Sequence, residues 1–163
     1  WDFAATEKQT SSDDPDYVVR LLMVEHNGIF YIEHVIRQRI GPGAVERLVV
    51  HTAEEDGRAV AITLEQEPGS AGKLFTAGLV RALAGYNVRA VPATGDKVAR
   101  AMGWLAQAEQ GNIRLKRGGW NAEYLDEICA FPVGGHDDQV GATSVAFATL
   151  TGRRPPTVSR YAH

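Results

Sequence analysis

Hydrophobic and polar residues alternate along the N-terminal third of the chain, with the period expected of β-strands that have one buried face. Three segments follow this pattern, at residues 1–6, 17–25 and 29–38. The last two are joined by His26-Asn27-Gly28, and Asn-Gly is a strong signal for a tight hairpin. The pattern therefore predicts an antiparallel meander of three strands, with a polar loop at residues 7–16 between the first two.

After residue 41 the period changes to that of helices alternating with short strands. Helical spacing of apolar residues predicts helices at residues 42–56, 71–83, 96–110, 120–130 and 137–150. Short extended runs predict strands at residues 60–64, 87–91 and 113–115. This order predicts an α/β fold, in which a mixed β-sheet of three antiparallel strands is extended by α/β units and flanked by helices. Residues 1–151 are expected to form one domain, and residues 152–163 a poorly ordered C-terminal tail.

Composition limits the protein class without identifying a function. A chain of 163 residues fits one domain with a sizeable core. Its formal net charge of −3 does not indicate general nucleic-acid binding, although a local basic groove is compatible with it. The single cysteine, Cys129, excludes an internal disulfide framework and fits a reducing cytoplasm. Because no apolar run approaches the length of a membrane span and the N-terminus has no signal-peptide pattern, we expect a cytoplasmic protein without membrane contact.

Acidic residues at the edges of predicted elements carry the clearest chemical signal. Asp137 and Asp138 follow Gly134-Gly135-His136 and open the last helix. Adjacent carboxylates repel each other, and they are tolerated best at a helix N-terminus or around a bound cation. Asp2 lies in the first predicted strand, and Glu65 ends the strand at residues 60–64. Three separated carboxylate positions of this kind predict a site for a hard cation such as Mg²⁺ or Mn²⁺.

Each acid also has a simpler interpretation. Asp2 is equally well a solvated residue of a frayed terminal strand, and Asp137 and Asp138 are also explained as ordinary N-terminal helix acids. Glu65 and Glu67 would share one face if the strand continued, or would form a solvated acidic turn before a Pro-Gly pair. We favour function for Glu65 and for the aspartate pair, with Glu67 the weaker candidate. Small residues in the last helix allow it to lie close to the sheet, which would bring the pair towards Asp2 and Glu65.

Basic residues are weaker candidates. Residues 68–73 superficially resemble a phosphate-binding loop, but Glu67 stands where that motif needs glycine and Leu74 where it needs Ser or Thr. A nucleotide-binding P-loop is therefore excluded, although Lys73 and nearby backbone N–H groups remain candidates for phosphate contact. The other candidates for a groove that follows a DNA backbone, each equally well a solvated surface group, are Lys97, Arg100, Lys116 and Arg117.

Four segments in order resemble the C-terminal nuclease domain of the phage terminase large subunit, the DNA-packaging motor protein of tailed phages and prophages. They are WDFAA at residues 1–5, LEQEPGSAGK at 64–73, GDKVARA at 95–101, and FP at 131–132 with GHDDQV at 135–140. The resemblance covers nearly the whole chain except the tail, and its last segment is the most specific. It implies an RNase H-like fold and a metal-dependent endonuclease that cleaves concatemeric double-stranded DNA during genome packaging.

The same resemblance implies a site and partners. It maps the metal-binding, catalytic acids onto Asp2, Glu65, Asp137 and Asp138. His136 is a candidate supporting or phosphate-facing group, and is equally well explained as a cap of the last helix. The implied partners are double-stranded DNA, the terminase ATPase domain, the terminase small subunit and the portal, in the cytoplasm of a bacterial host cell. Because this chain has no Walker A motif, we expect the ATPase domain to lie N-terminal to it in a longer protein. Relatives often carry a further Asp four residues after the first of the pair, where this chain has Gly141, which predicts a weaker second metal site.

The mechanistic hypothesis is two-metal-ion hydrolysis of a phosphodiester. Asp2, Glu65 and an Asp of the pair would hold two Mg²⁺ or Mn²⁺ ions roughly 3.5–4 Å apart, activating water and stabilising the departing 3′-oxygen. The all-oxygen ligand set argues against zinc. Two alternatives remain open. Another RNase H-like nuclease, of the resolvase or integrase type, would differ in substrate, and a non-catalytic RNase H-like binding module would lack carboxylate-dependent metal affinity.

Overall fold

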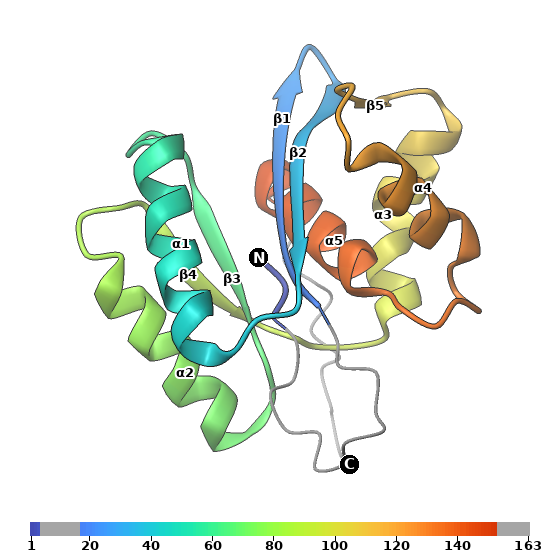
Figure 1. Ribbon diagram of the computed structural model, residues 1–163. Coiled ribbons are helices and arrows are strands. Elements are labelled where there is room, and N and C mark those ends of the chain that lie inside the picture. Colours follow the sequence, from blue (N-terminus) through green and yellow to red (C-terminus); the bar gives the residue numbers. More distant parts are fainter. Residues whose placement is uncertain (4–16, 153–163) are drawn as a thin grey trace, which may run out of the picture.

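The computed structural model describes residues 1–3 and 17–152 (Figure 1). The predicted loop at residues 7–16, the end of the first predicted strand and the tail beyond Gly152 lie outside the described residues. The strands are β1 (Val18–His26), β2 (Ile29–Gln38), β3 (Ile62–Gln66), β4 (Val88–Pro92) and β5 (Ile113–Leu115). The helices are α1 (Pro42–Asp56), α2 (Gly69–Ala82), α3 (Lys97–Glu109), α4 (Asn121–Ala130) and α5 (Asp138–Thr151).

Strands β1 and β2 form the predicted antiparallel hairpin. Its turn residues Asn27 and Gly28 both have positive φ angles, 53° and 78°, which is the conformation that favours Asn-Gly in tight hairpins. Strand β5 pairs parallel with β2, giving a sheet in the order β1-β2-β5. Strands β3 and β4 pair parallel in a second sheet of two strands. The predicted single mixed sheet is therefore observed as two smaller sheets.

The N-terminal segment, residues 1–3, links these two sheets through the main chain. Asp2 exchanges two backbone hydrogen bonds of 2.9 Å with Val19 of β1, antiparallel as predicted. On the other side, the Trp1 nitrogen donates to the Thr63 carbonyl at 2.8 Å, and the Glu65 N–H donates to the Trp1 carbonyl at 2.9 Å. In Figure 1 the N-terminus accordingly lies between β1 and β3. This pairing places Asp2 and Glu65 on neighbouring segments.

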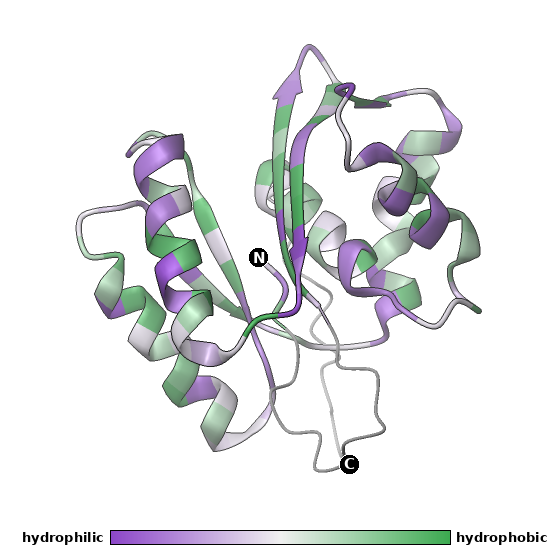
Figure 2. Cartoon of the chain, in the orientation of Figure 1, coloured by the Kyte–Doolittle hydropathy of each residue, from purple (hydrophilic) through white to green (hydrophobic). Residues whose placement is uncertain are grey.

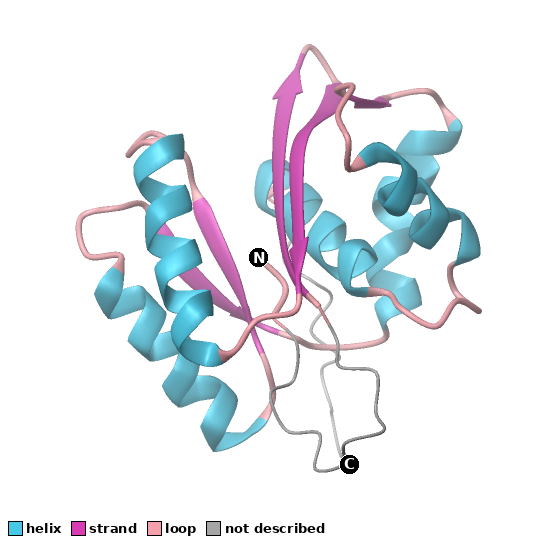
Figure 3. Ribbon diagram, viewed as in Figure 1, coloured by secondary structure: helices cyan, strands magenta, loops and turns pink. Residues whose placement is uncertain are grey.

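Helices lie on both sides of the strands (Figure 3), and buried residues form two hydrophobic cores between these elements. Adjacent residues Val18 and Val19 point to opposite faces and join different cores, as the strand period requires. One core packs β1 and β2 against α3, α4 and α5, with Trp104 and Val140 at its centre. The other packs α1, α2 and β3 around Phe3. Figure 2 shows hydrophobic segments along the strands and a hydrophilic hairpin tip. No helix within the described ranges is both long and apolar enough to cross a membrane.

All element limits lie within two residues of the prediction, and those of β2, α1 and β5 are reproduced. The strand expected at residues 60–64 is wrong by two residues, since β3 covers Ile62–Gln66. Val60 instead donates its N–H to the Gly57 carbonyl in the preceding turn, and Gln66 still pairs with Pro92 of β4. Glu65 is therefore a residue of the strand itself, and its backbone N–H is bonded to the Trp1 carbonyl.

Candidate active site

Three of the predicted acids meet at the junction between the two sheets. Asp2 comes from the N-terminal segment, Glu65 from β3 and Asp138 from the first turn of α5. Their exposed fractions are only 5%, 3% and 7%. Burial raises the pKa of Asp2 well above its usual value, and Glu65 and Asp138 raise it further while Lys97 opposes them. The fold therefore concentrates negative charge in a place that water does not neutralise.

Asp137 and Asp138 are adjacent in sequence but differ in their contacts. Asp137 occupies the N-cap position of α5 but makes no capping hydrogen bond with its side chain. Its Oδ1 instead accepts a hydrogen bond of 2.8 Å from Lys97 Nζ, which also donates to the Asp137 carbonyl at 3.0 Å. Asp138 is buried, and its Oδ2 accepts the backbone N–H of Tyr17 at 3.1 Å. Simple capping therefore does not account for the pair.

Two cations on the first turn of α3 face the acids. Lys97 and Arg100 are three residues apart, so they share one side of the helix. Arg100 Nη1 forms an ion pair with Glu65 Oε1, and Lys97 Nζ lies 3.7 Å from Asp2 Oδ2. Burial alone would lower the pKa of Lys97, but Asp2, Asp137 and Asp138 together raise it above its usual value. These two predicted DNA-binding residues thus neutralise part of the acidic charge in the chain without metal.

Gly141 allows α5 to approach the N-terminal segment closely. A Cβ atom built at this position would lie 1.9 Å from Asp2 Oδ2 and 3.2 Å from Lys97 Cε. No side chain fits there unless Asp2 moves, because real Cβ contacts are far longer. The backbone at Gly141 is therefore the surface on which Asp2 and Lys97 pack.

The acidic residues fit a hard divalent cation. Asp2 Oδ2 and Glu65 Oε2 are buried and accept no hydrogen bond from any residue that the structure describes. Buried carboxylate oxygens in that state are costly, and a cation is the partner that stabilises them best. Across residues 1–3 and 17–152, no three Asp, Glu, His or Cys side chains lie close enough to form a ready-made metal cage. Lys97 lies 3.7 Å from Asp2 Oδ2 and Arg100 pairs with Glu65, so cations of the chain itself face two of these acids.

The remaining predicted residues are not drawn into this cluster in the same way. His136 is half-buried and meets the Tyr17 ring edge to face at 5.3 Å between ring centres. Glu67 is half-buried just after β3, where its backbone is packed against Gly72. Lys73 is exposed on α2. Lys116 forms an ion pair of 2.9 Å with Glu33, and the next residue, Arg117, is exposed. Both follow β5, and strands β2 and β1 lie between β5 and Asp2.

Sequence reasoning missed Glu127 of α4, which is buried against the start of α5. Its Oε1 accepts the backbone N–H groups of Gln139 at 2.6 Å and Val140 at 3.4 Å. A signal for it did exist, because Glu127 lies three residues after the buried Tyr124 and therefore on the buried face of the helix. An acid on an apolar helix face needs a partner inside the protein.

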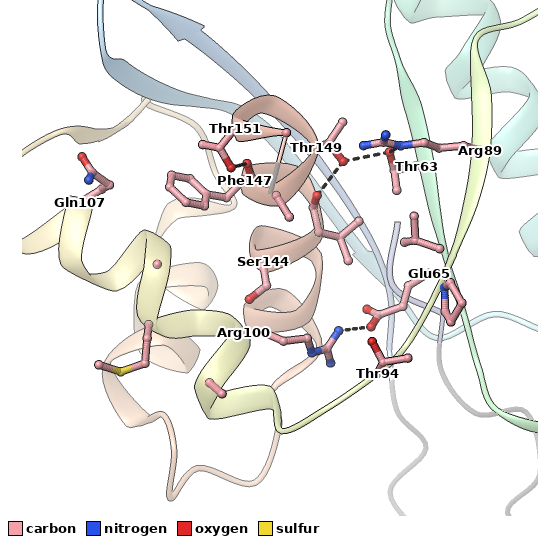
Figure 4. Close-up of a pocket in the computed structure, with 18 of the residues that line it drawn as sticks. Thr63, Glu65, Arg89, Thr94, Arg100, Gln107, Ser144, Phe147, Thr149 and Thr151 are labelled. Carbon is pink, nitrogen blue, oxygen red and sulfur yellow. Dashed lines mark hydrogen bonds and ion pairs between the residues drawn. The ribbon is translucent and has the colours of Figure 1, made fainter. Parts of the chain in front are cut away.

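A cleft of about 990 Å³ opens beside the acids, between β3–β4 and α3–α5 (Figure 4). Glu65 and Arg100 lie at one end of it, joined by their ion pair. Arg89 of β4 donates to the Thr63 hydroxyl at 3.2 Å on the β3–β4 wall that also carries Glu65, and Thr63 also bonds Thr149 of α5 at 2.9 Å. Of the acids described above, Glu65 lines this cleft, which thus gives access to one side of the acidic cluster.

Comparison with known proteins gives a match to a protein family. A family model described as the terminase RNaseH-like domain matches residues 1–150, which include every acid of the cluster. None of the curated proteins compared with the chain matches it. The α/β architecture, with helices on both faces of the strands, is that expected from the sequence for an RNase H-like fold. The match spans far more than half of the chain, and the chain therefore belongs to the family of terminase RNaseH-like domains.

Proposed function

We propose that this chain is the metal-dependent endonuclease domain of a terminase large subunit and cleaves concatemeric double-stranded DNA during genome packaging. The observation that carries the proposal is the convergence of buried Asp2, Glu65 and Asp138 from three separate elements, with two carboxylate oxygens that accept no hydrogen bond from the described residues. Structural acids are seldom buried together in this way, whereas sites for hard cations require it.

Asp2, Glu65 and Asp138 are the residues that would hold Mg²⁺ or Mn²⁺. When bound, such ions supply the Lewis acidity that phosphodiester hydrolysis needs, both for acidifying water and for neutralising charge on the phosphate. No protein nucleophile is required. The site of this chain departs from the expected pair of ion positions at Gly141, where no ligand is present. The first ion position is therefore the better supported of the two.

Lys97 and Arg100 have two roles in this proposal. In the absence of metal they hold the acids through ion pairs and limit the repulsion between them. When a cation takes over the carboxylates, both groups become donors for the phosphates of the bound strand, to which Arg and Lys are well suited. Asp137 keeps the Lys97 ammonium beside the site through two hydrogen bonds.

The wider assembly is proposed from family membership. Double-stranded DNA is the substrate, and the ATPase domain of the same motor, the terminase small subunit and the portal are the partners. With a formal net charge of −3, the chain alone binds DNA weakly and mainly through phosphate contacts. We therefore expect the partners to supply most of the affinity for the DNA.

Cleavage of supercoiled plasmid by the purified chain tests the function. With Mn²⁺ or Mg²⁺ we expect nicking and linearisation, and none in EDTA. Asp2→Asn, Glu65→Gln and Asp138→Asn should each lower the rate on the order of 100-fold or more, as other losses of transition-state charge stabilisation do. The matched control is Asp126→Asn, which removes an exposed acid of α4 outside the site and should cleave like the wild type.

Two results would contradict this assignment. Either metal-dependent cleavage persists in a folded Asp138→Asn variant, or wild-type cleavage is unaffected by EDTA. If the wild type does not cleave with either metal, a Mn²⁺ thermal shift separates the remaining cases. Carboxylate-dependent stabilisation would mean that the nuclease needs its motor partner, and its absence would favour a non-catalytic binding module.

A further inference from the structure

We propose that Glu127 and Arg37 are positioning residues that fix the start of α5, and with it Asp138, for cation binding. Together with Tyr17 and Gln139 they form a closed set of contacts, which we call the α5 clamp. The inference rests on the proposed function, because it takes Asp138 to be a metal ligand. Neither Glu127 nor Arg37 is given a contact with metal or DNA.

Glu127 supplies the cap that the N-terminus of α5 lacks. The first turn of any helix has backbone N–H groups without partners in the helix, and the N-cap side chain usually accepts one of them. Asp137 does not do so here. Glu127 Oε1 accepts the N–H groups of Gln139 and Val140 instead, while its Oε2 accepts the Gln139 side-chain amide at 2.8 Å. A buried carboxylate at this helix end also interacts favourably with the helix dipole.

Arg37 connects this cap to the other side of Asp138. Its Nε lies 3.5 Å from Glu127 Oε2, and its guanidinium carbon lies 3.4 Å from the centre of the Tyr17 ring. The Tyr17 backbone N–H in turn donates to Asp138 Oδ2 at 3.1 Å. The contacts therefore run from α4 through β2 to Tyr17 and back to α5. They hold Asp138 by its carboxylate and the two residues after it by their backbone N–H groups.

This arrangement leaves the two aspartates at the start of α5 available for other work. Because Glu127 caps the helix, the Asp137 carboxylate is directed to Lys97 instead. If the first turn of α5 frayed, Asp138 would lose its fixed position beside Asp2. Groups that orient a metal ligand without touching the metal typically change metal affinity by about 10–100-fold. The clamp is therefore expected to set how tightly the site binds its cation, rather than the chemistry of the bound state.

The test is Mn²⁺ affinity, measured by calorimetry at a temperature where every variant is folded by circular dichroism. Glu127→Ala should raise the Kd for Mn²⁺ by about 10–100-fold, and Glu127→Gln, which keeps one acceptor oxygen, by less. The matched control is Asp126→Ala, which removes an exposed acid next to Glu127 on α4 and should leave the Kd unchanged. At saturating Mn²⁺, Glu127→Ala should regain plasmid cleavage, whereas Asp138→Asn should not.

A folded Glu127→Ala variant with wild-type Mn²⁺ affinity would overturn the clamp. If that variant does not fold, Glu127→Gln and Arg37→Met are measured instead. Wild-type Mn²⁺ affinity in both of them would also overturn the clamp. Failure of the proposed function looks different. Wild-type protein that binds no Mn²⁺, or an Asp138→Asn variant that binds it normally, would overturn both ideas at once. If Asp138→Asn loses Mn²⁺ binding as expected but the Glu127 and Arg37 variants keep wild-type affinity, only the clamp is overturned.

Discussion

At the scale of single residues, Asp2 is the group whose environment is least explained by folding alone. It is buried beside Glu65 and near Asp138, and burial and these charges raise its pKa. The ammonium of Lys97, 3.7 Å from Asp2 Oδ2, only partly offsets this rise. The raised pKa of Asp2 means that, without metal, the folded protein holds this proton more tightly than the unfolded chain does. Such a residue costs stability, which is typical of sites organised for a ligand.

Asp2→Asn is therefore expected to stabilise the metal-free protein at neutral pH. Because the folded pKa of Asp2 lies above the ordinary value of 3.8, the free energy of unfolding of the wild type falls as the pH rises through the window above that value. The variant should lack this part of the pH dependence and gain on the order of 1 kcal/mol at pH 7. Urea unfolding in EDTA across a pH series measures both effects.

Adding Mn²⁺ should reverse the order of stability. The cation stabilises the folded wild type by binding to it, and it should not stabilise the variant to the same degree. A variant that is less stable than the wild type in EDTA at pH 7, with an unchanged pH profile, would show that Asp2 is an ordinary structural carboxylate.

At the scale of elements, the sequence predicted local structure well because its signals are local. The Asn27-Gly28 turn, the helical period of α1 and the short β5 depend on neighbouring residues, and all were predicted correctly. The two-sheet arrangement was not predicted, because Trp1 reaches β3 through pairing between residues more than sixty positions apart. The Glu127 cap was missed for a similar reason, since Glu127 belongs to α4 and accepts backbone N–H groups of α5.

The acidic positions were predictable from residue type and from their place at element edges, but their surroundings were not. Lys97 and Arg100 were interpreted as surface residues of a DNA groove, and the structure places them against Asp2 and Glu65. Their spacing of three residues indicates that they share one face of a helix, but it does not indicate which part of the sheet that face packs against. Whether they also contact DNA stays a prediction.

Helix α5 gives a test at this scale, through Gly141→Ala. Replacing glycine by alanine inside a helix normally stabilises it by up to about 1 kcal/mol. At Gly141 the new methyl group would displace the Asp2 carboxylate, so we expect that gain to be lost and the Mn²⁺ affinity to fall by about 10-fold or more. Urea unfolding and calorimetry measure the two quantities.

Gly78→Ala in α2 is the matched control, because its Cβ would meet only the end of the Arg81 side chain, at 3.9 Å. It should gain helix stability and bind Mn²⁺ like the wild type. If Gly141→Ala behaved in the same way as Gly78→Ala, the close packing of Asp2 on α5 would have no functional meaning.

At the scale of the whole molecule, the candidate site lies where the two halves of the fold meet (Figure 1). Glu65 belongs to the smaller sheet, Asp138 to a helix that packs on the larger sheet, and Asp2 to the segment that joins them. Neither half of the fold contains all three acids by itself. Formation of the acidic cluster therefore depends on the complete fold, and this explains why no short motif in the sequence specifies it.

The location of bound metal in a crystal of the purified chain tests this account most directly. Anomalous diffraction after soaking with Mn²⁺ should give a peak bounded by the carboxylates of Asp2, Glu65 and Asp138, with the Lys97 and Arg100 ion pairs to Asp2 and Glu65 broken. The peak should be absent in Asp138→Asn crystals. A wild-type crystal with no manganese at these carboxylates, or with manganese bound only elsewhere, would contradict the claim that this cluster is the metal site of a nuclease.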